Sequence, residues 1–218
     1  MKNNEILNAL NFRYACKEFD KNKKIKDEDL RLILESARLS PSSIGIEPWK
    51  FLVITNEALK DELASVTLGG KKQLPTCSHL ILILNRTADD LNFDSKYLKK
   101  LFSEDKGLPK EAADTRLNMI KNVNETRFKN NKNEINHYSR EQTYIALGTM
   151  LTTSALLGID SCAIGGFDSE AVTKILSEKN ILDTDHFNLS CMLALGYRNE
   201  NPTPKTRRSF EDVVEFIK

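Results

Sequence analysis

The segment His79-Leu80-Ile81-Leu82-Ile83-Leu84 carries aliphatic side chains at five consecutive positions. Such a run predicts a β-strand, and consecutive side chains of a strand point to opposite faces of its sheet. Because both faces are apolar here, we expect the sheet to be covered on both sides. The segment therefore predicts a sheet enclosed between two further layers.

Shorter patterns on either side of this segment predict the remaining elements. Asp27 is a candidate N-cap and Pro41 a helix stop, while 94–136 is polar and rich in Lys and Asn, with breaks at Gly107 and Pro109. Strands are expected at 50–54, 161–164 and 189–195, and helices at 6–12, 28–40, 57–66, 144–157 and 169–176. Because helices outnumber short strands, we expect one three-layered α+β domain over 1–218, with 94–136 as a helical excursion.

The overall composition excludes several classes of protein. The 218 residues hold 32 basic and 31 acidic side chains, and 40% of the chain is hydrophobic. This balance gives no global basic excess for nucleic acid or an anionic membrane. The chain has no run of 18 apolar residues and no signal-peptide core, so we expect a cytoplasmic protein without a membrane span. The scattered cysteines lack a CxxC pair, which argues against structural zinc and favours reduced core thiols.

Two segments leave open whether the chain pairs with a second copy. The helix expected at 144–157 is apolar almost all round, with small residues such as Ala146 and Gly148. It is either a core helix or a helix that crosses the core to a dimer interface. The tail 212–217 favours a strand but follows a polar loop, so it could join a neighbouring subunit's sheet.

Common catalytic and nucleotide-binding motifs are absent, and three local clusters remain. The sequence has no phosphate loop, GxGxxG, GxSxG or HExxH. The clusters are Arg13-Tyr14-Ala15-Cys16-Lys17-Glu18-Phe19, the turn 40–51, and Pro204-Lys205-Thr206-Arg207-Arg208. Lys205 and Arg207 alternate on an extended segment, so they point the same way and suit a phosphate group. Taken singly, each cluster also fits an ordinary surface or loop.

In combination the clusters resemble the flavin-dependent nitroreductase family, in its bacterial nitrofuran- and quinone-reducing branch. Arg13-x-x-x-Lys17-x-Phe19-Asp20 is similar to the family's N-terminal flavin motif. The other matching stretches are Leu39-Ser40-Pro41-Ser42-Ser43, Glu47-Pro48-Trp49-Lys50-Phe51, Gly158 to Cys162, Ile164 to Asp168, Gly196-Tyr197-Arg198 and Pro204 to Arg207. Their order and spacing extend over nearly the whole chain, with 94–136 as the weakest part.

The resemblance implies a homodimer with two FMN molecules at the subunit interface. It also implies a central mixed sheet wrapped by helices, with the C-terminal strand crossing to the partner. By the family's motifs, Arg13, Lys205 and Arg207 hold the FMN phosphate, and Lys17 lies near N1 and O2 of the flavin ring. The further FMN-binding residues that the resemblance implies are Tyr14, Ala15, Pro41, Ser42, Ser43, Gly45, Gln73, Ile164, Gly165 and Gly166.

Four positions depart from the family's pattern. Ala15 stands where many members have Ser, and Gln73 where a relative has Lys. Gly165 replaces a frequent acidic residue, and Gly45 replaces a common Asn. These changes bear on redox potential and substrate range more than on FMN binding.

The activity implied is an NAD(P)H oxidoreductase that reduces nitroaromatics or quinones in a two-electron ping-pong cycle. The flavin N5 carries the chemistry, so no catalytic side chain and no metal is expected. A free-flavin reductase or a dehalogenase of the same fold is an alternative. A second alternative is a non-enzymatic module that binds nucleic acid through Lys205, Arg207 and Arg208. The balanced total charge argues against it.

Overall fold

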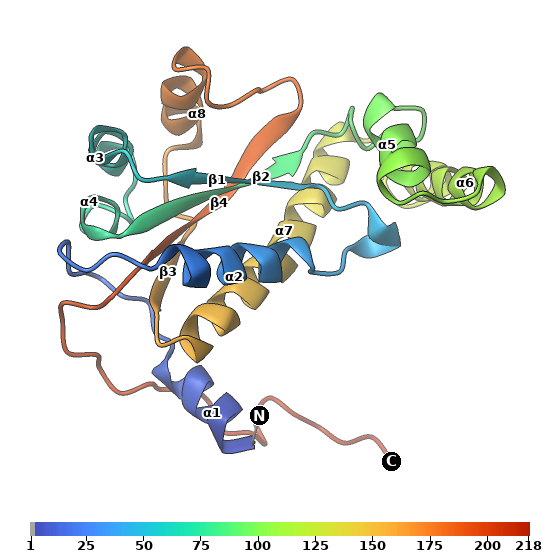
Figure 1. The fold of residues 1–218 in the computed structure, drawn as a ribbon. Coiled ribbons are helices and arrows are strands. Elements are labelled where there is room, and N and C mark those ends of the chain that lie inside the picture. Colours follow the sequence, from blue (N-terminus) through green and yellow to red (C-terminus); the bar gives the residue numbers. More distant parts are fainter. Residues whose placement is uncertain (1–2) are drawn as a thin grey trace.

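The computed structural model describes residues 3–218, and its helices surround a single four-stranded sheet (Figure 1). The strands are β1 (Trp49–Ile54), β2 (His79–Arg86), β3 (Asp160–Ile164) and β4 (Phe187–Gly196). The helices are α1 (Asn3–Phe12), α2 (Asp27–Arg38), α3 (Glu57–Ser65), α4 (Gln73–Thr76), α5 (Lys96–Lys100), α6 (Lys110–Thr126), α7 (Lys132–Leu156) and α8 (Ser169–Glu178). A short 3-10 turn covers Ser43–Gly45 and a π-helical turn covers Leu101–Asp105.

Strand β2 lies inside the sheet and is covered on both faces, as its sequence predicts. The strand order is β1-β2-β4-β3. Leu80, Leu82 and Leu84 point to one face, where the side chains of α3, α4 and α8 pack against them. Ile81 and Ile83 point to the other face and meet α2 and α7. Full burial of each such side chain contributes about 1.5–3 kcal/mol, so β2 anchors all three layers.

The pairing within the sheet corrects one detail of the expected architecture. Every ladder between the named strands is antiparallel. Within residues 3–218, parallel pairing occurs only at an isolated bridge between Ala15 and Ser161. The α+β class is confirmed, whereas the mixed character of the sheet is limited to that bridge. The tail 212–217 forms no strand in the chain and leaves Phe216 and Ile217 largely exposed.

Helix α7 is longer than its apolar half predicts. It begins at Lys132, because the side-chain oxygen of Asn131 accepts hydrogen bonds from the backbone N–H groups of Asn133 (2.9 Å) and Glu134 (3.4 Å). Its sequence is polar in the first half, where burial of Ile135 and Tyr138 holds the helix in place. The helix ends before Gly158, whose φ of +70° suits glycine. At α2, Lys26 rather than Asp27 occupies the N-cap position.

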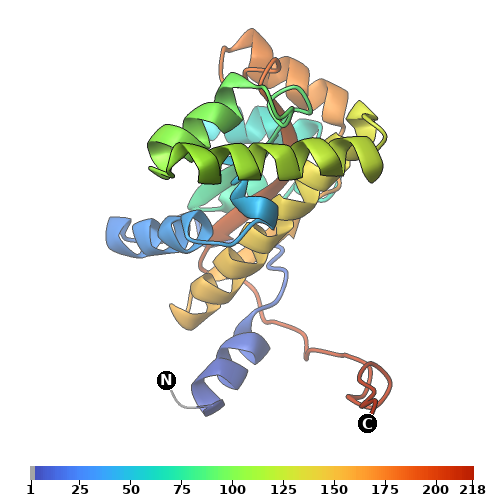
Figure 2. The ribbon, with the colours of Figure 1, turned by 90° about the vertical axis from the view of Figure 1, so that its right-hand side faces the viewer.

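The excursion 94–136 has an apolar cluster of its own. Helices α5 and α6 flank the expected break, where Gly107 has a φ of +58° and Pro109 is the N-cap of α6. Figure 2 shows the yellow-green α6 crossing α7. The buried members of the cluster include Leu98, Phe102, Ile120, Phe128 and Tyr138. The segment therefore packs on α7 more firmly than its polar composition indicates.

One face of α7 remains open although the helix contributes to the core. Leu147 and Met150 are buried against the sheet, while Tyr144, Ile145 and Leu156 are each more than 40% exposed. The helix therefore combines a core face with an apolar exposed face. No helix within residues 3–218 is both long and apolar enough to cross a bilayer.

Candidate functional site

The two ends of the chain meet beside the sheet and form a short pairing. The backbone N–H of Asp20 donates to the carbonyl of Tyr197 (2.8 Å), and that of Asn199 donates to the carbonyl of Glu18 (3.0 Å). Phe19 and Arg198 form an isolated antiparallel bridge between them. In Figure 1 the blue N-terminal segment lies beside the red segment that follows β4. Phe19 and Arg198, 179 positions apart in the chain, thus reach the same place.

Beyond this pairing the two segments diverge and enclose a cleft of about 450 Å³. Arg13 and Lys17 come from the N-terminal wall, and Lys205 and Arg207 come from the C-terminal wall. The lining residues are Arg13, Tyr14, Ala15, Lys17, Glu200, Asn201, Thr203, Pro204, Lys205, Thr206 and Arg207. Six of the residues predicted from the sequence therefore converge on one cleft.

The cleft concentrates positive charge. Burial lowers the pKa of Lys205, and the neighbouring positive charges of Arg13 and Arg207 lower it further. Its ammonium group donates to the carbonyl of Leu10, and the Arg207 guanidinium donates to the carbonyl of Thr206 (2.6 Å). Four cations around one hollow suit a phosphate dianion, which can accept several charge-assisted hydrogen bonds. The donor set in this cleft therefore fits the phosphate of a nucleotide-like cofactor.

Glu200 is the one acidic residue that lines the cleft, and the sequence motifs did not indicate it. Its carboxylate accepts hydrogen bonds from the Tyr14 hydroxyl (2.8 Å) and the Lys17 backbone N–H (2.5 Å). Partial burial raises the pKa of Glu200, but these hydrogen bonds outweigh it and hold that pKa below its ordinary value. Burial, followed by the bond to Glu200, raises the pKa of Tyr14 far above 10.

A second group of predicted residues lies next to β3. Ile164 is buried, while Gly165 and Gly166 are exposed in the loop that follows it. The Gly166 carbonyl accepts from the backbone N–H of Gly69 (3.0 Å), which joins this loop to the segment before α4. Gln73 is buried on α4.

Cys162 on β3 connects this group with the cleft. Burial raises the pKa of its thiol, while the positive charge of Lys17 and a hydrogen bond with Gln73 act in the opposite sense. Lys17 of the cleft and Gln73 on α4 thus both affect the pKa of the same thiol on β3. Ala15 of the cleft lining also forms a parallel bridge with Ser161 on β3, so the β3 group adjoins the cleft, although none of its members lines it.

The turn with Pro41, Ser42, Ser43 and Gly45 is not brought to the cleft by this chain. The Ser42 hydroxyl accepts from the Glu47 backbone N–H, and the Ser43 backbone N–H donates to the Gln142 side chain on α7, both at 2.9 Å. None of the turn residues lines the cleft. Gly45 has a φ of +74°, a conformation open to Gly and, less readily, to Asn.

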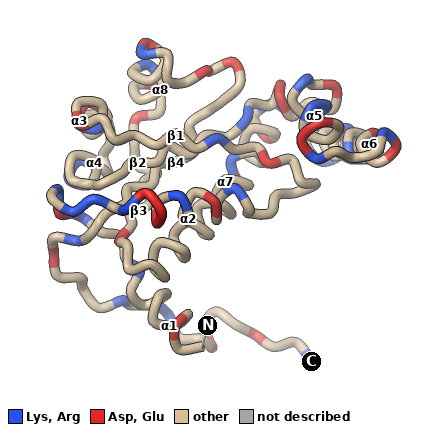
Figure 3. Tube along the Cα trace, in the orientation of Figure 1, with Lys and Arg blue, Asp and Glu red and all other residues tan. Residues whose placement is uncertain are grey.

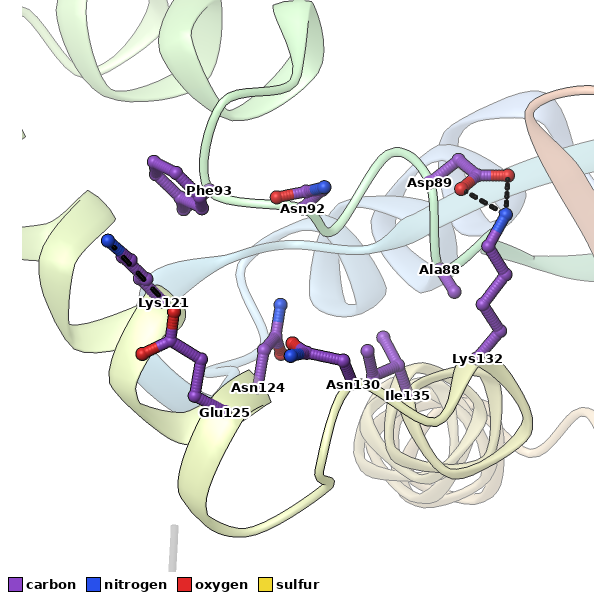
Figure 4. A pocket seen from close by; sticks show the side chains of 10 residues that line it. All are labelled: Ala88, Asp89, Asn92, Phe93, Lys121, Asn124, Glu125, Asn130, Lys132 and Ile135. Atoms are coloured by element: carbon purple, nitrogen blue, oxygen red, sulfur yellow. Dashed lines mark hydrogen bonds and ion pairs between the residues drawn. The ribbon is translucent and has the colours of Figure 1, made fainter.

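A separate hollow of about 380 Å³ lies between the 88–93 loop and helices α6 and α7 (Figure 4). Its two lysines are paired, Lys132 with Asp89 (2.7 Å) and Lys121 with Glu125 (4.0 Å). None of the predicted residues lines it. Because its charges are balanced, this hollow does not suit a phosphate dianion.

The rest of the described chain mixes basic and acidic residues, apart from one basic run at 21–26. Figure 3 shows basic and acidic residues interspersed along the trace. The four cysteines are buried and free, as expected for core thiols. Among residues 3–218, no group of His, Cys, Asp or Glu is arranged to hold a metal ion.

Comparison with known proteins identifies the family of the chain. A model described as "Nitroreductase family" matches residues 10–197. YfkO of Bacillus subtilis strain 168, assigned by name as an NAD(P)H nitroreductase, is 44% identical over 98% of this chain and 97% of its own.

Two solved structures share the fold. An NAD(P)H:FMN oxidoreductase of Staphylococcus epidermidis has a TM-score of 0.80 and 22% identity, covering 100% of this chain and 98% of that one. A nitroreductase of Exiguobacterium sibiricum in complex with FMN has a TM-score of 0.76 and 22% identity, covering 97% of each chain. With the family model spanning both the N-terminal cation segment and the whole sheet, the chain belongs to the nitroreductase family.

Proposed function

We propose that the protein is an FMN-dependent NAD(P)H oxidoreductase that reduces nitroaromatics or quinones by two-electron ping-pong hydride transfer. The observation that carries this proposal is the convergence of Arg13, Lys17, Lys205 and Arg207 on one cleft. The FMN complex of the Exiguobacterium sibiricum nitroreductase and the name of the Bacillus subtilis relative support it.

Three cations of the cleft would hold the FMN phosphate. Arg13 approaches from one wall, and Lys205 and Arg207 approach from the other, so the phosphate would bridge the walls. The carbonyl of Leu10 already orients the Lys205 ammonium group. Tyr14 and Ala15 would line the passage from the phosphate toward β3. The methyl group of Ala15 offers no hydrogen bond there, so the three cations would supply the binding of the phosphate.

Lys17 and the β3 loop would surround the flavin ring. When bound, FMN would supply the two-electron acceptor and donor. Lys17 would place a positive charge beside the ring and so favour added negative charge on it. Gln73 can donate a hydrogen bond without adding charge. Gly165 and Gly166, which follow the buried Ile164, would leave backbone groups accessible, because glycine lets a ligand approach the main chain closely.

We further propose a homodimer in which the turn of a second copy completes the site. Pro41, Ser42, Ser43 and Gly45 lie away from the cleft of their own chain and would reach the cleft of the partner. The exposed apolar face of α7 offers a surface for such pairing. The exposed tail 212–217 would then add a strand to the partner's sheet.

Within this proposal, residues 1–218 act as one domain, and the excursion 94–136 borders the active site. Since the reaction consumes NAD(P)H, we expect the enzyme in the cytoplasm. The acceptor is tested by steady-state NADPH and NADH turnover with nitrofurazone, menadione and free FMN in parallel. Turnover with the nitro compound and the quinone supports the proposal, whereas turnover with free FMN alone supports a free-flavin reductase.

The binding-module alternative is tested by nucleic-acid gel shift. Binding that survives about 200 mM salt would favour it, because nonspecific phosphate contacts weaken steeply with salt. The mixed charge distribution instead predicts no shift under those conditions.

A further inference from the structure

Glu200 lies at the point where the paired ends of the chain separate. On one side, backbone hydrogen bonds join Asp20 to Tyr197 and Glu18 to Asn199. On the other side, the segments diverge into the two walls of the cleft. Next to this pairing, the Lys17 N–H donates to the Glu200 carboxylate instead of a backbone carbonyl, at 2.5 Å. The side chain thus supplies the last contact before the walls part.

The same carboxylate oxygen also fixes the neighbouring wall residue Tyr14. The hydroxyl of Tyr14 donates to it at 2.8 Å, so one oxygen receives two donors from the N-terminal wall. Glu200 itself belongs to the C-terminal segment that leads to Lys205 and Arg207. Both bonds cross the apex of the cleft and join parts of the chain that are 183 and 186 positions apart.

A carboxylate among four cations could serve the site in two opposite ways. As a competing anion it would weaken the attraction for a phosphate. As a hydrogen-bonded link it would hold the walls at the separation that lets Arg13 and the Lys205–Arg207 segment reach one ligand. The geometry favours the second role, because the carboxylate accepts from the Tyr14 hydroxyl and the Lys17 backbone rather than from the cationic side chains.

We infer that Glu200 is a positioning residue: its carboxylate latches the two walls of the cleft and thereby sets the spacing of the cations that bind the FMN phosphate. This inference rests on the proposed function for the identity of the ligand. The latch itself is a property of the protein without ligand. Pre-forming both walls lowers the cost of ordering them when the ligand binds.

The test compares Glu200→Ala with Glu200→Gln, which keeps an acceptor oxygen and removes the charge. Glu178→Gln on α8 is the control, since Glu178 is an exposed acid paired only distantly with Lys174 (3.8 Å). Hydrogen exchange of the Lys17 amide is measured in the flavin-free full-length protein, and the FMN dissociation constant is measured by fluorescence quenching. Circular dichroism verifies that each variant is folded.

The latch predicts faster Lys17 exchange and a roughly tenfold weaker FMN affinity for Glu200→Ala. Glu200→Gln and the control should stay within about threefold of the parent in both measurements. Unchanged Lys17 exchange in Glu200→Ala, equal losses in Ala and Gln, or tighter FMN binding by Ala would each overturn the inference. If the parent protein binds no FMN, the proposed function fails. The exchange measurement still tests whether the Glu200 carboxylate holds the two walls together.

Discussion

Replacing Arg207 by Ala separates binding of the cofactor from stability of the fold. Arg207 is exposed, and its guanidinium donates a hydrogen bond to the carbonyl of the adjacent Thr206. Loss of that local contact should leave the flavin-free protein's thermal midpoint nearly unchanged. The side chain does line the cleft, so the expected loss falls on the ligand.

The size of the loss follows from the bonds that a guanidinium makes to phosphate. A hydrogen bond to a charged group contributes about 1.5–3 kcal/mol, and each 1.4 kcal/mol is a factor of ten in affinity. Arg207→Ala should therefore raise the FMN dissociation constant by roughly 10- to 100-fold. Screening at an exposed site favours the lower end of this range.

The assay is FMN titration by fluorescence quenching, with size-exclusion chromatography to verify that the oligomeric state is unchanged. Arg208→Ala is the matched control, because Arg208 is the exposed neighbour and does not line the cleft. It should retain FMN at the parent's affinity. Equal affinity of Arg207→Ala and the parent, or equal losses in both variants, would refute the reasoning.

Three further predictions rest on other parts of the molecule. Burial and nearby cations lower the pKa of Lys205 below its ordinary value, so its positive charge is lost at a lower pH. FMN affinity, titrated across the alkaline range, should therefore fall as pH rises through that lowered pKa. Lys205→Arg should remove the fall, because arginine stays charged. A Cβ at Gly196 would lie 2.8 Å from the Phe19 ring, so Gly196→Ala should cost about 1–3 kcal/mol in urea unfolding; an unchanged midpoint would contradict this overlap. Burial raises the pKa of Cys16 to about 12 and of Cys77 and Cys191 to about 11, so a thiol reagent near pH 8 should label them only after denaturation.

The sequence predicted the fold best where one pattern determines both local structure and burial. The alternation of Leu and Ile through β2 predicted cover on both faces, and each set of side chains meets its own helices. Prediction failed where tertiary packing overrides local composition. The sequence placed 132–136 in a separate helical excursion and began the apolar helix at 144, whereas the Asn131 cap and the buried Tyr138 make one continuous helix from Lys132.

The candidate site divides in the same way. Arg13, Lys17, Lys205 and Arg207 stand in short motifs, and the structure places all four around one cleft. Glu200 has no motif, because its role comes from a contact with Lys17 that no local spacing encodes. The turn at Pro41 to Gly45 lies elsewhere in the chain, so its predicted part in the site depends on a second copy.

The absorbance spectrum of the purified protein tests the central claim most directly. If Arg13, Lys205 and Arg207 hold an FMN phosphate in the cleft, the protein should be yellow, with a band near about 450 nm that NADPH or NADH bleaches without oxygen. Protein that purifies without flavin should acquire this band on incubation with FMN. A colourless protein that takes up no added FMN would contradict the account.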